Sequence, residues 1–253
     1  MRTKPGSENG ENCQTCSVRD QGFFRNLSGA TLKALDAIRF TTTYPEGAIL
    51  FAEGEAARCV MVLTRGCAKV SMMSREGRIL ILRVAQPGEV LGLTSAISNT
   101  PCQTSVETLE RSQVNFYQRK EFLRILVEHG DASLAAAEQL SRCYAMVCEQ
   151  ARSIGLFRSV PERLARFLLA WTAGGVQTGQ SSRTVLPLSQ EEIGQMIGAS
   201  RETVTRTLGT FRDRHLASFK GTMLTIPDRS VLARLVNPES RDRFSCAAMN
   251  VSL

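Results

Sequence analysis

The chain has 253 residues but only 2 histidines, 1 tryptophan and no run of 18 apolar residues. The isolated His129 and His215 offer little acid–base chemistry, and no Gly-rich phosphate loop, HExxH or GxSxG pattern occurs. The opening residues also lack the charged and then apolar pattern of a signal peptide. We therefore expect a cytoplasmic protein that neither spans a membrane nor acts as an enzyme.

The composition is that of a globular protein with a sizeable core, since 43% of the residues are hydrophobic and 22% are charged. The length leaves room for two domains. The formal net charge is +7, which permits a polyanionic partner. Residues 155–237 hold 11 Lys and Arg against 6 Asp and Glu, so most of the excess lies in the C-terminal third. This placement suits the neutralisation of nucleic-acid phosphates.

The most informative stretch, 186–214, predicts a short helix, a turn and a second helix. Ser189 and Glu192 have the spacing of a capping box that begins the first helix. Three apolar residues at i, i+3 and i+4 predict its buried face: Ile193, Met196 and Ile197. Gly198 tolerates the positive φ that ends a helix, and Ser200 can cap the next one.

The second helix is expected to be amphipathic. Its predicted inward residues are Val204, Leu208 and Phe211. Its predicted outward residues are Arg201, Glu202, Thr205 and Arg206. Arginine donates two hydrogen bonds to guanine and a carboxylate accepts from cytosine, so this face fits the major groove, although a solvated amphipathic helix has the same pattern.

The identities of the residues in 186–214 point to one protein family more specifically than the spacing of their apolar and polar side chains does. The stretch closely resembles the recognition motif of the Crp–Fnr family of bacterial transcription regulators. The residues that carry this resemblance are Ile193-Gly194-Gln195, Gly198-Ala199-Ser200-Arg201-Glu202-Thr203-Val204 and Arg206. The resemblance covers roughly residues 23–236. It implies an α+β chain with an N-terminal β-roll (a cyclic-nucleotide-binding-like jelly roll), a long dimerisation helix and a C-terminal winged helix-turn-helix.

This organisation predicts five parts. They are a flexible N-terminal segment 1–22, a sensory β-roll 23–130, a dimerisation helix and hinge 131–157, a DNA-binding domain 158–237 and a tail 238–253. Short strands separated by glycine turns are expected from Phe40 to about Tyr117. The individual strands expected are 48–51, 59–63, 68–72 and 79–84, and the series is expected to end at 87–92. Residues 173–182 are expected to form a loop, and two strands around Lys220 a wing.

In family members that bind a cyclic nucleotide, a glutamate and an arginine–serine pair in the segment after the last strand hold the ribose and the phosphate. The corresponding stretch here, 93–105, contains no carboxylate and no arginine. A buried phosphate without a cationic partner would be costly. We therefore expect the β-roll to bind something other than a cyclic nucleotide.

A long helix is expected from Asp131 to Ile154. Its apolar residues step by 3, 4, 3, 4 and 3, which is a heptad stripe: Ala137, Leu140, Tyr144, Val147, Ala151 and Ile154. A helix that packs on the β-roll shows similar spacing, but the family resemblance implies that the stripe is the homodimer interface. A dimer would bind a pseudo-palindromic DNA site.

The cysteines are the least settled feature. Cys13 and Cys16 form a CxxC that resembles the start of the iron–sulfur cluster motif in the oxygen-sensing branch of the family, but Gly22 stands where a third ligand belongs and Asn115 near the fourth. Cys102, Cys59, Cys67 or a partner chain would have to supply the two missing ligands. An inert remnant, a thiol redox switch, a zinc site and an iron–sulfur centre therefore all stay open, and the cofactor is unknown.

The leading hypothesis is a homodimeric, sequence-specific transcription regulator that contacts RNA polymerase and has no membrane partner. The expected DNA-binding residues are Ser189, Gln190, Ser200, Arg201, Glu202, Thr205, Arg206 and Lys220. The alternative is a ligand- or redox-sensing signalling module whose DNA binding is secondary.

Overall fold

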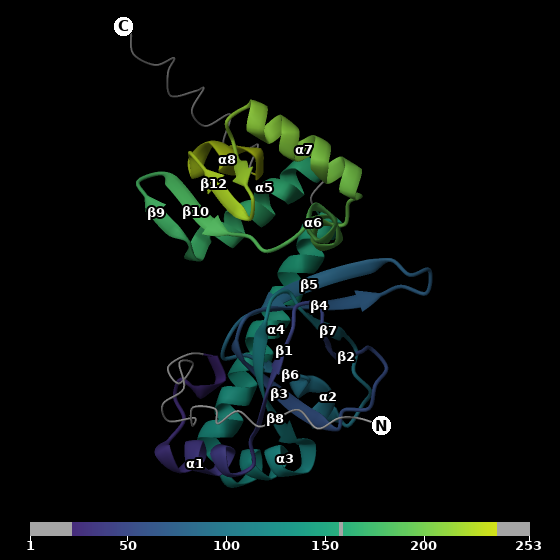
Figure 1. The fold of residues 1–253 in the computed structure, drawn as a ribbon, viewed down its shortest axis with the longest axis vertical. Helices are drawn as coiled ribbons and strands as arrows, with labels where there is room; N and C mark the ends of the chain where they lie inside the picture. Colours follow the sequence, from purple (N-terminus) through teal and green to yellow (C-terminus); the bar gives the residue numbers. More distant parts are fainter. Residues whose placement is uncertain (1–21, 157–158, 237–253) are drawn as a thin grey trace, which may run out of the picture. The chain divides into compact units, whose positions relative to one another are not determined.

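The computed structural model describes residues 22–156 and 159–236. Cys13 and Cys16, for which a metal or redox role is predicted, lie outside the described residues. The chain divides into two compact units, Met1–Cys148 and Glu149–Leu253, with the division inside helix α4 (Gly130–Leu156) (Figure 1). The first unit is mainly antiparallel sheet and the second combines helices with a small sheet. The expected α+β class and the order of β-roll, long helix and helix-turn-helix are confirmed.

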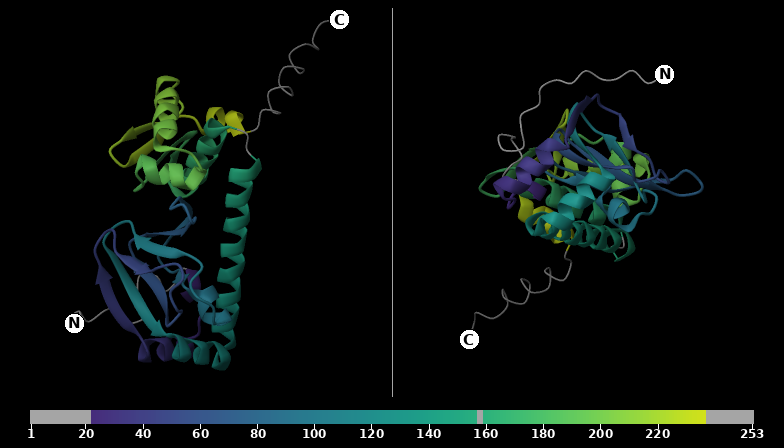
Figure 2. Two further views of the ribbon diagram at one scale, coloured as in Figure 1. Left: turned by 90° about the vertical axis from the view of Figure 1, so that its right-hand side faces the viewer. Right: turned by 90° about the horizontal axis from the view of Figure 1, so that it is seen from below.

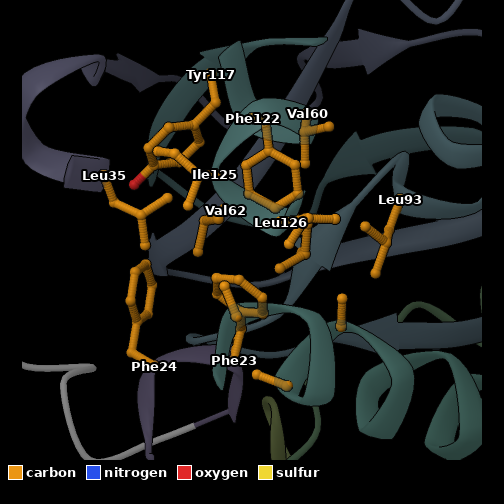
Figure 3. Close-up of a cluster of buried hydrophobic side chains, with 14 of the residues drawn as sticks. Phe23, Phe24, Leu35, Val60, Val62, Leu93, Tyr117, Phe122, Ile125 and Leu126 are labelled. Atoms are coloured by element: carbon orange, nitrogen blue, oxygen red, sulfur yellow. The ribbon is translucent and has the colours of Figure 1, made fainter. Parts of the chain in front are cut away.

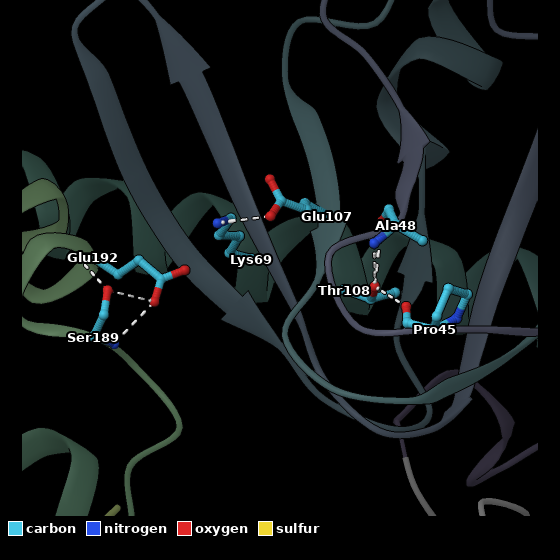
Figure 4. A network of polar contacts seen from close by, with 7 residues as sticks. All are labelled: Pro45, Ala48, Lys69, Glu107, Thr108, Ser189 and Glu192. Carbon is cyan, nitrogen blue, oxygen red and sulfur yellow. Dashed lines mark hydrogen bonds and ion pairs between the residues drawn. The ribbon is translucent and has the colours of Figure 1, made fainter.

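Two antiparallel four-stranded sheets form the β-roll. One has the order β1-β8-β3-β6, with bounds Phe40–Tyr44, Ser112–Gln118, Cys59–Arg65 and Val90–Leu91. The other has the order β2-β7-β4-β5, with bounds Ile49–Phe51, Ser105–Thr108, Ala68–Met73 and Ile79–Ala85. The buried Thr108 ties the turn before β2 to β7, because its hydroxyl donates to Pro45 O (2.7 Å) and accepts from Ala48 N (2.9 Å) (Figure 4).

The sheet β1-β8-β3-β6 has an apolar core on each face. Between the two sheets lie buried side chains from both, such as Leu63, Val70 and Val114. On the other face, Val60, Val62 and Tyr117 pack against the helices (Figure 3). Alternate residues of β3 therefore enter different cores, which explains why almost the whole strand is buried and apolar.

The strand-rich region expected from Phe40 to about Tyr117 is confirmed, but the expectation that the series of strands ends at 87–92 was wrong. Strands β7 and β8 follow, and β8 lies at the centre of its sheet, paired with both β1 and β3. The sequence signal was weak because this segment is interrupted by polar residues such as Gln113 and Asn115. Asn115 is nevertheless buried, where its side-chain carbonyl accepts a hydrogen bond from Thr41 Oγ1 (2.8 Å).

Helices cover the outer face of this sheet. They are η1 (Gly22–Phe24), α1 (Gly29–Ala37), α2 (Leu93–Ser98), α3 (Arg119–Glu128) and the first part of α4. Figure 2 shows α4 running along one side of the β-roll. Gln139 anchors α4 there, since its buried amide accepts from Val90 N (3.1 Å) and donates to Val90 O (2.8 Å).

The second unit begins with the last turns of α4 and continues with α5 (Val160–Trp171) and the 3-10 turn η2 (Thr172–Gly174). Next come β9 (Val176–Thr178), β10 (Ser181–Val185), α6 (Gln190–Ile197) and α7 (Arg201–Asp213). The unit ends with β11 (Ser218–Lys220), β12 (Met223–Ile226) and α8 (Arg229–Val236). Its core includes the buried Leu164, Leu168, Ile193 and Phe211.

The two wing strands expected around Lys220 are confirmed, since β11 pairs with β12, but the prediction of a loop at 173–182 was wrong. Residues 176–185 form the hairpin β9–β10, and β10 pairs with β12, so the sheet has four strands in the order β11-β12-β10-β9. The strand β10 has the sequence SSRTV, which has no apolar alternation to indicate a strand. Pairing with β12, and not local propensity, makes it a strand.

No helix within 22–156 or 159–236 combines the length and the apolar character needed to cross a membrane.

Asp131 joins the start of α4 to the start of α1. Its carboxylate accepts hydrogen bonds from Ser28 N (2.7 Å) and Thr31 Oγ1 (2.8 Å), and Ser28 is itself the N-cap of α1. Desolvation raises the pKa of Asp131, but hydrogen bonds from Ser28, Thr31 and Ala132 outweigh it and lower the pKa from 3.8 to about 2. The ionised carboxylate therefore stabilises the folded state.

We expect this contribution to be complete above pH 3.8 and to be lost as the pH falls towards 2, since the folded-state pKa is the lower one. Urea unfolding of the wild type and of Asp131→Asn tests this. The wild type should be more stable by about 1 kcal/mol at pH 6, allowing for solvent screening, and this difference should shrink at pH 3. A difference that does not change with pH would contradict the role of the charge.

Candidate DNA-binding site

Helix α6 begins as the sequence predicts. Ser189 is its N-cap, with Ser189 Oγ accepting from Glu192 N (3.2 Å) and the Glu192 carboxylate accepting from Ser189 N (2.9 Å), so the capping box is confirmed (Figure 4). Ile193, Met196 and Ile197 are buried, as expected. Gly198 ends the helix in the left-handed region, at φ 64°.

The backbone of α6 and the turn that leads to α7 approach each other closely. Ala199 N donates to Gly194 O (2.9 Å), and a Cβ atom on Gly194 would lie 2.6 Å from Ala199 O. Only glycine leaves room for the backbone to return at this distance. Gly194 therefore sets where α7 begins relative to α6.

Helix α7 begins at the predicted cap and exposes the predicted face. Ser200 Oγ accepts from Thr203 N (3.3 Å). Arg201, Glu202, Thr205 and Arg206 are all exposed in the first two turns, whereas Val204 and Phe211 are buried. Leu208 is only half-buried, and the buried position beside it is Thr207, whose hydroxyl donates to Thr203 O (2.7 Å). A threonine can enter the core here because the helix backbone satisfies its hydroxyl.

Interactions within the protein orient two of the exposed side chains, Glu202 and Thr205. The pKa of Glu202 is lowered by hydrogen bonds from its own backbone N–H and from Ser200, and further by Arg201, so it is ionised at neutral pH. Thr205 Oγ1 donates to Gln190 Oε1 and to Arg201 O, which links the exposed ends of α6 and α7. The face therefore presents cations beside one anionic acceptor.

The other predicted DNA-binding residues lie around this face or in the same unit. The hydroxyls of Ser189 and Ser200 serve as helix caps, and Gln190 contacts Thr205. Lys220 is exposed at the end of β11, beside the turn at Gly221. Sequence reasoning missed Arg163, which lies on α5 and whose guanidinium donates to Gly198 O (3.3 Å), thereby supporting the turn from behind.

The end of α4 also supports the helix-turn-helix. Gln150 Nε2 donates to Met196 O, and Arg166 forms an ion pair with Glu149. The side chain of Ile154 lies beside Gly198. Ile154 belongs to the predicted dimer stripe, but its side chain also packs against Gly198 within its own unit.

The remaining stripe residues are more open. Tyr144 is 73% exposed and Val147 is 42% exposed. Ala137 and Ala151 are also exposed, whereas Leu140 is half-buried against the core of the β-roll. The stripe is therefore an apolar strip on the surface of this chain.

The described cysteines do not form a metal site. Within the two described ranges, no group of three or more His, Cys, Asp and Glu side chains could hold a metal ion. Burial raises the pKa of Cys102, of Cys59 and, to about 12, of Cys67, so the neutral thiol is favoured at these positions in the metal-free chain.

The backbone also excludes a cysteine at position 22. Gly22 has φ 54°, and a Cβ there would lie 2.2 Å from Gly88 O, while the neighbouring Phe23 N donates to the same oxygen (2.9 Å). The packing of η1 on the β-roll therefore requires glycine at position 22.

Comparisons with known proteins agree with this geometry. Residues 162–235 match a Crp-like helix-turn-helix domain and residues 41–129 match a cyclic nucleotide-binding domain. The chain is 28% identical, over 84% of its length and 95% of the relative's, to a CRP-like cAMP-activated global transcriptional regulator of Mycobacterium tuberculosis. It is 25% identical to the nitrogen fixation regulation protein FixK of Bradyrhizobium diazoefficiens, over 82% of this chain and 86% of that protein.

The fold has solved counterparts as well. A CooA mutant from Carboxydothermus hydrogenoformans superposes with a TM-score of 0.70 at 20% identity, over 92% of this chain and 98% of that one. At this identity the likeness shows the fold alone. The two domain matches and the relatives that align over most of their length show that the chain belongs to the Crp–Fnr family of transcription regulators.

The close turn predicts a contrast between two helical glycines. Gly194→Ala should lower the free energy of unfolding by about 2 kcal/mol, because the added methyl group meets backbone that cannot move away. Gly209→Ala, in α7, should instead raise it by up to about 1 kcal/mol, because nothing lies within 4 Å of the new Cβ. Urea unfolding measures both, and equal effects would show that α6 and α7 are not held at this distance.

Proposed function

We propose that this regulator binds double-stranded DNA as a homodimer, with α7 of each protomer in the major groove of one half of a pseudo-palindromic operator. The observation that supports this most directly is the exposure of Arg201, Glu202, Thr205 and Arg206 on one face of α7. They lie in the first two turns, the end of a recognition helix that meets the base edges.

The chemistry of this face favours G·C pairs. Arg201 and Arg206 can each donate two hydrogen bonds to guanine, and the ionised Glu202 can accept one from the amine of cytosine. Thr205 can contact a thymine methyl group or donate its hydroxyl. Lys220, Ser189, Gln190 and Ser200 would contact phosphates or neighbouring bases and fix the position of the helix.

The apolar stripe on α4 is the proposed dimer interface. Tyr144 is 73% exposed and Val147 is 42% exposed in the single chain, and a second copy of α4 would bury this exposed apolar surface. Two copies related by a two-fold axis would place the recognition helices about one turn of DNA apart.

RNA polymerase is a proposed partner of the DNA-bound dimer. The effector is proposed to act through the β-roll or through Cys13 and Cys16. The alternative, a ligand- or redox-sensing module whose DNA binding is secondary, differs in one observable: its affinity for an operator would not exceed that for random DNA.

Arg206→Ala tests the base contacts. The operator should first be obtained by selection from random DNA with the wild-type protein. The variant should bind it more weakly by about 1–3 kcal/mol and lose its preference at one base pair of each half-site. Arg212→Ala is a matched control, because Arg212 is an exposed arginine in the last turn of the same helix and contacts Asp213. An unchanged base preference in the Arg206 variant would contradict this assignment.

Tyr144→Glu tests the dimer interface. The charge should separate the protomers because burying two carboxylates in an apolar seam is costly, while the 73% exposed side chain leaves the fold of the single chain intact. Met146→Glu is the control, since Met146 is exposed on another face of α4. Sedimentation equilibrium should give a monomer for the first variant and a dimer for the second. A dimer in both cases would place the interface elsewhere.

A further inference from the structure

The β-roll contains a cavity of about 320 Å³ within the first unit. Its walls come from β2, β4, β5, β6 and β7, from α2 and the residues that precede β7, and from α4. The volume is at the lower end of the range for small-molecule sites in proteins.

Most of the wall is apolar. Side chains such as Phe51, Val70, Leu82, Val106 and Leu140 contribute carbon surface to it. The polar residues deep in the wall are satisfied by the protein itself. Gln139 bonds both backbone groups of Val90, and Ser95 Oγ donates to Pro101 O (3.3 Å). A ligand in this part of the cavity finds hydrocarbon surface and few free hydrogen-bonding groups.

The charge of the wall is also neutralised. Arg83 is the one charged residue among the described residues that line the cavity, and its guanidinium forms an ion pair with Glu89. Both side chains are largely buried, at 12% and 20% exposure, and Glu89 also accepts from Gln86 N (3.0 Å). An anionic ligand would have to displace Glu89 and leave its carboxylate without the cation, which is costly.

A cyclic nucleotide, the ligand that the matched domain implies, therefore does not fit these residues. Its phosphate would need a cation that Glu89 already holds. Leu93, in the segment expected to hold ribose and phosphate, is 4% exposed and packs in the apolar core (Figure 3). Within residues 22–156 and 159–236, no carboxylate lines the cavity to accept from the ribose hydroxyls.

We propose that this cavity binds a small, uncharged and mainly apolar molecule. Transfer of its apolar surface from water to the cavity would supply most of the binding free energy. Three polar residues, Thr94, Gln103 and Thr104, offer one or two hydrogen bonds that would orient it.

The ligand would also contact the long helix. Gln139, Leu140, Cys143 and Val147 of α4 line the cavity, and two of them belong to the proposed dimer stripe. A bound molecule would thus change the packing of α4, a consequence that rests on the proposed function. The binding site itself does not depend on it.

The test is titration of the full-length protein with N-phenyl-1-naphthylamine, a neutral apolar dye that fluoresces when it leaves water. The wild type should bind it, and millimolar cyclic AMP should not displace it. Thr104→Trp, which fills the half-buried rim of the cavity, should weaken binding at least about tenfold. Thr100→Trp is the matched control, because Thr100 is exposed outside the cavity, and it should bind the dye as the wild type does.

A second readout locates the dye. Saturation with it should slow alkylation of Cys143 by N-ethylmaleimide, followed by peptide mass spectrometry, but leave Cys148 unaffected, since only Cys143 lines the cavity. Displacement by cyclic AMP, equal binding by both tryptophan variants or unprotected Cys143 would each overturn the proposal. A protein that binds the dye but shows no preference for any operator would contradict the proposed function and leave this inference intact.

Discussion

The close approach of Gly194 and Ala199 is the constraint on which the DNA-binding face depends. Because a Cβ at residue 194 would lie 2.6 Å from Ala199 O, the chain can return only over a glycine. The turn then places Ser200 as the cap of α7, and the buried Val204 and Phe211 fix the rotation of that helix. Because this rotation is fixed, Arg201, Arg206 and Glu202 lie on the exposed side of α7.

The β-roll combines the architecture of a cyclic nucleotide-binding domain with a cavity whose wall is mostly apolar. Its sheets, the short helix α2 and the first part of α4 enclose a cavity, as a ligand-binding domain requires. The ion pair between Arg83 and Glu89 and the apolar Leu93 leave that cavity without a free charge. The identity of a few side chains, and not the fold, decides what such a cavity can hold.

The cysteines illustrate the same separation between motif and site. A CxxC indicates two ligands, but a cluster also requires partners that reach it as thiolates. Gly22 is held where no side chain fits, and Cys59, Cys67 and Cys102 have raised pKa values because they are buried. Cys67 and Cys102 are buried in the β-roll and Cys59 is half-buried there, so all three side chains contribute to its packing.

The amino-acid sequence alone determined the helix-turn-helix, its caps and its exposed face, because these depend on contacts within a few residues. Ser189 with Glu192, Ser200 with Thr203 and the apolar spacing of α6 are local features. Tertiary structure alone decided that the polar segment 181–185 is a strand, since β12 pairs with it, and that β8 lies at the centre of its sheet. It also decided which charges remain available in the cavity. The strand pairs and the Arg83–Glu89 ion pair form only when the whole unit folds and brings these residues into contact. A local sequence pattern does not predict such contacts.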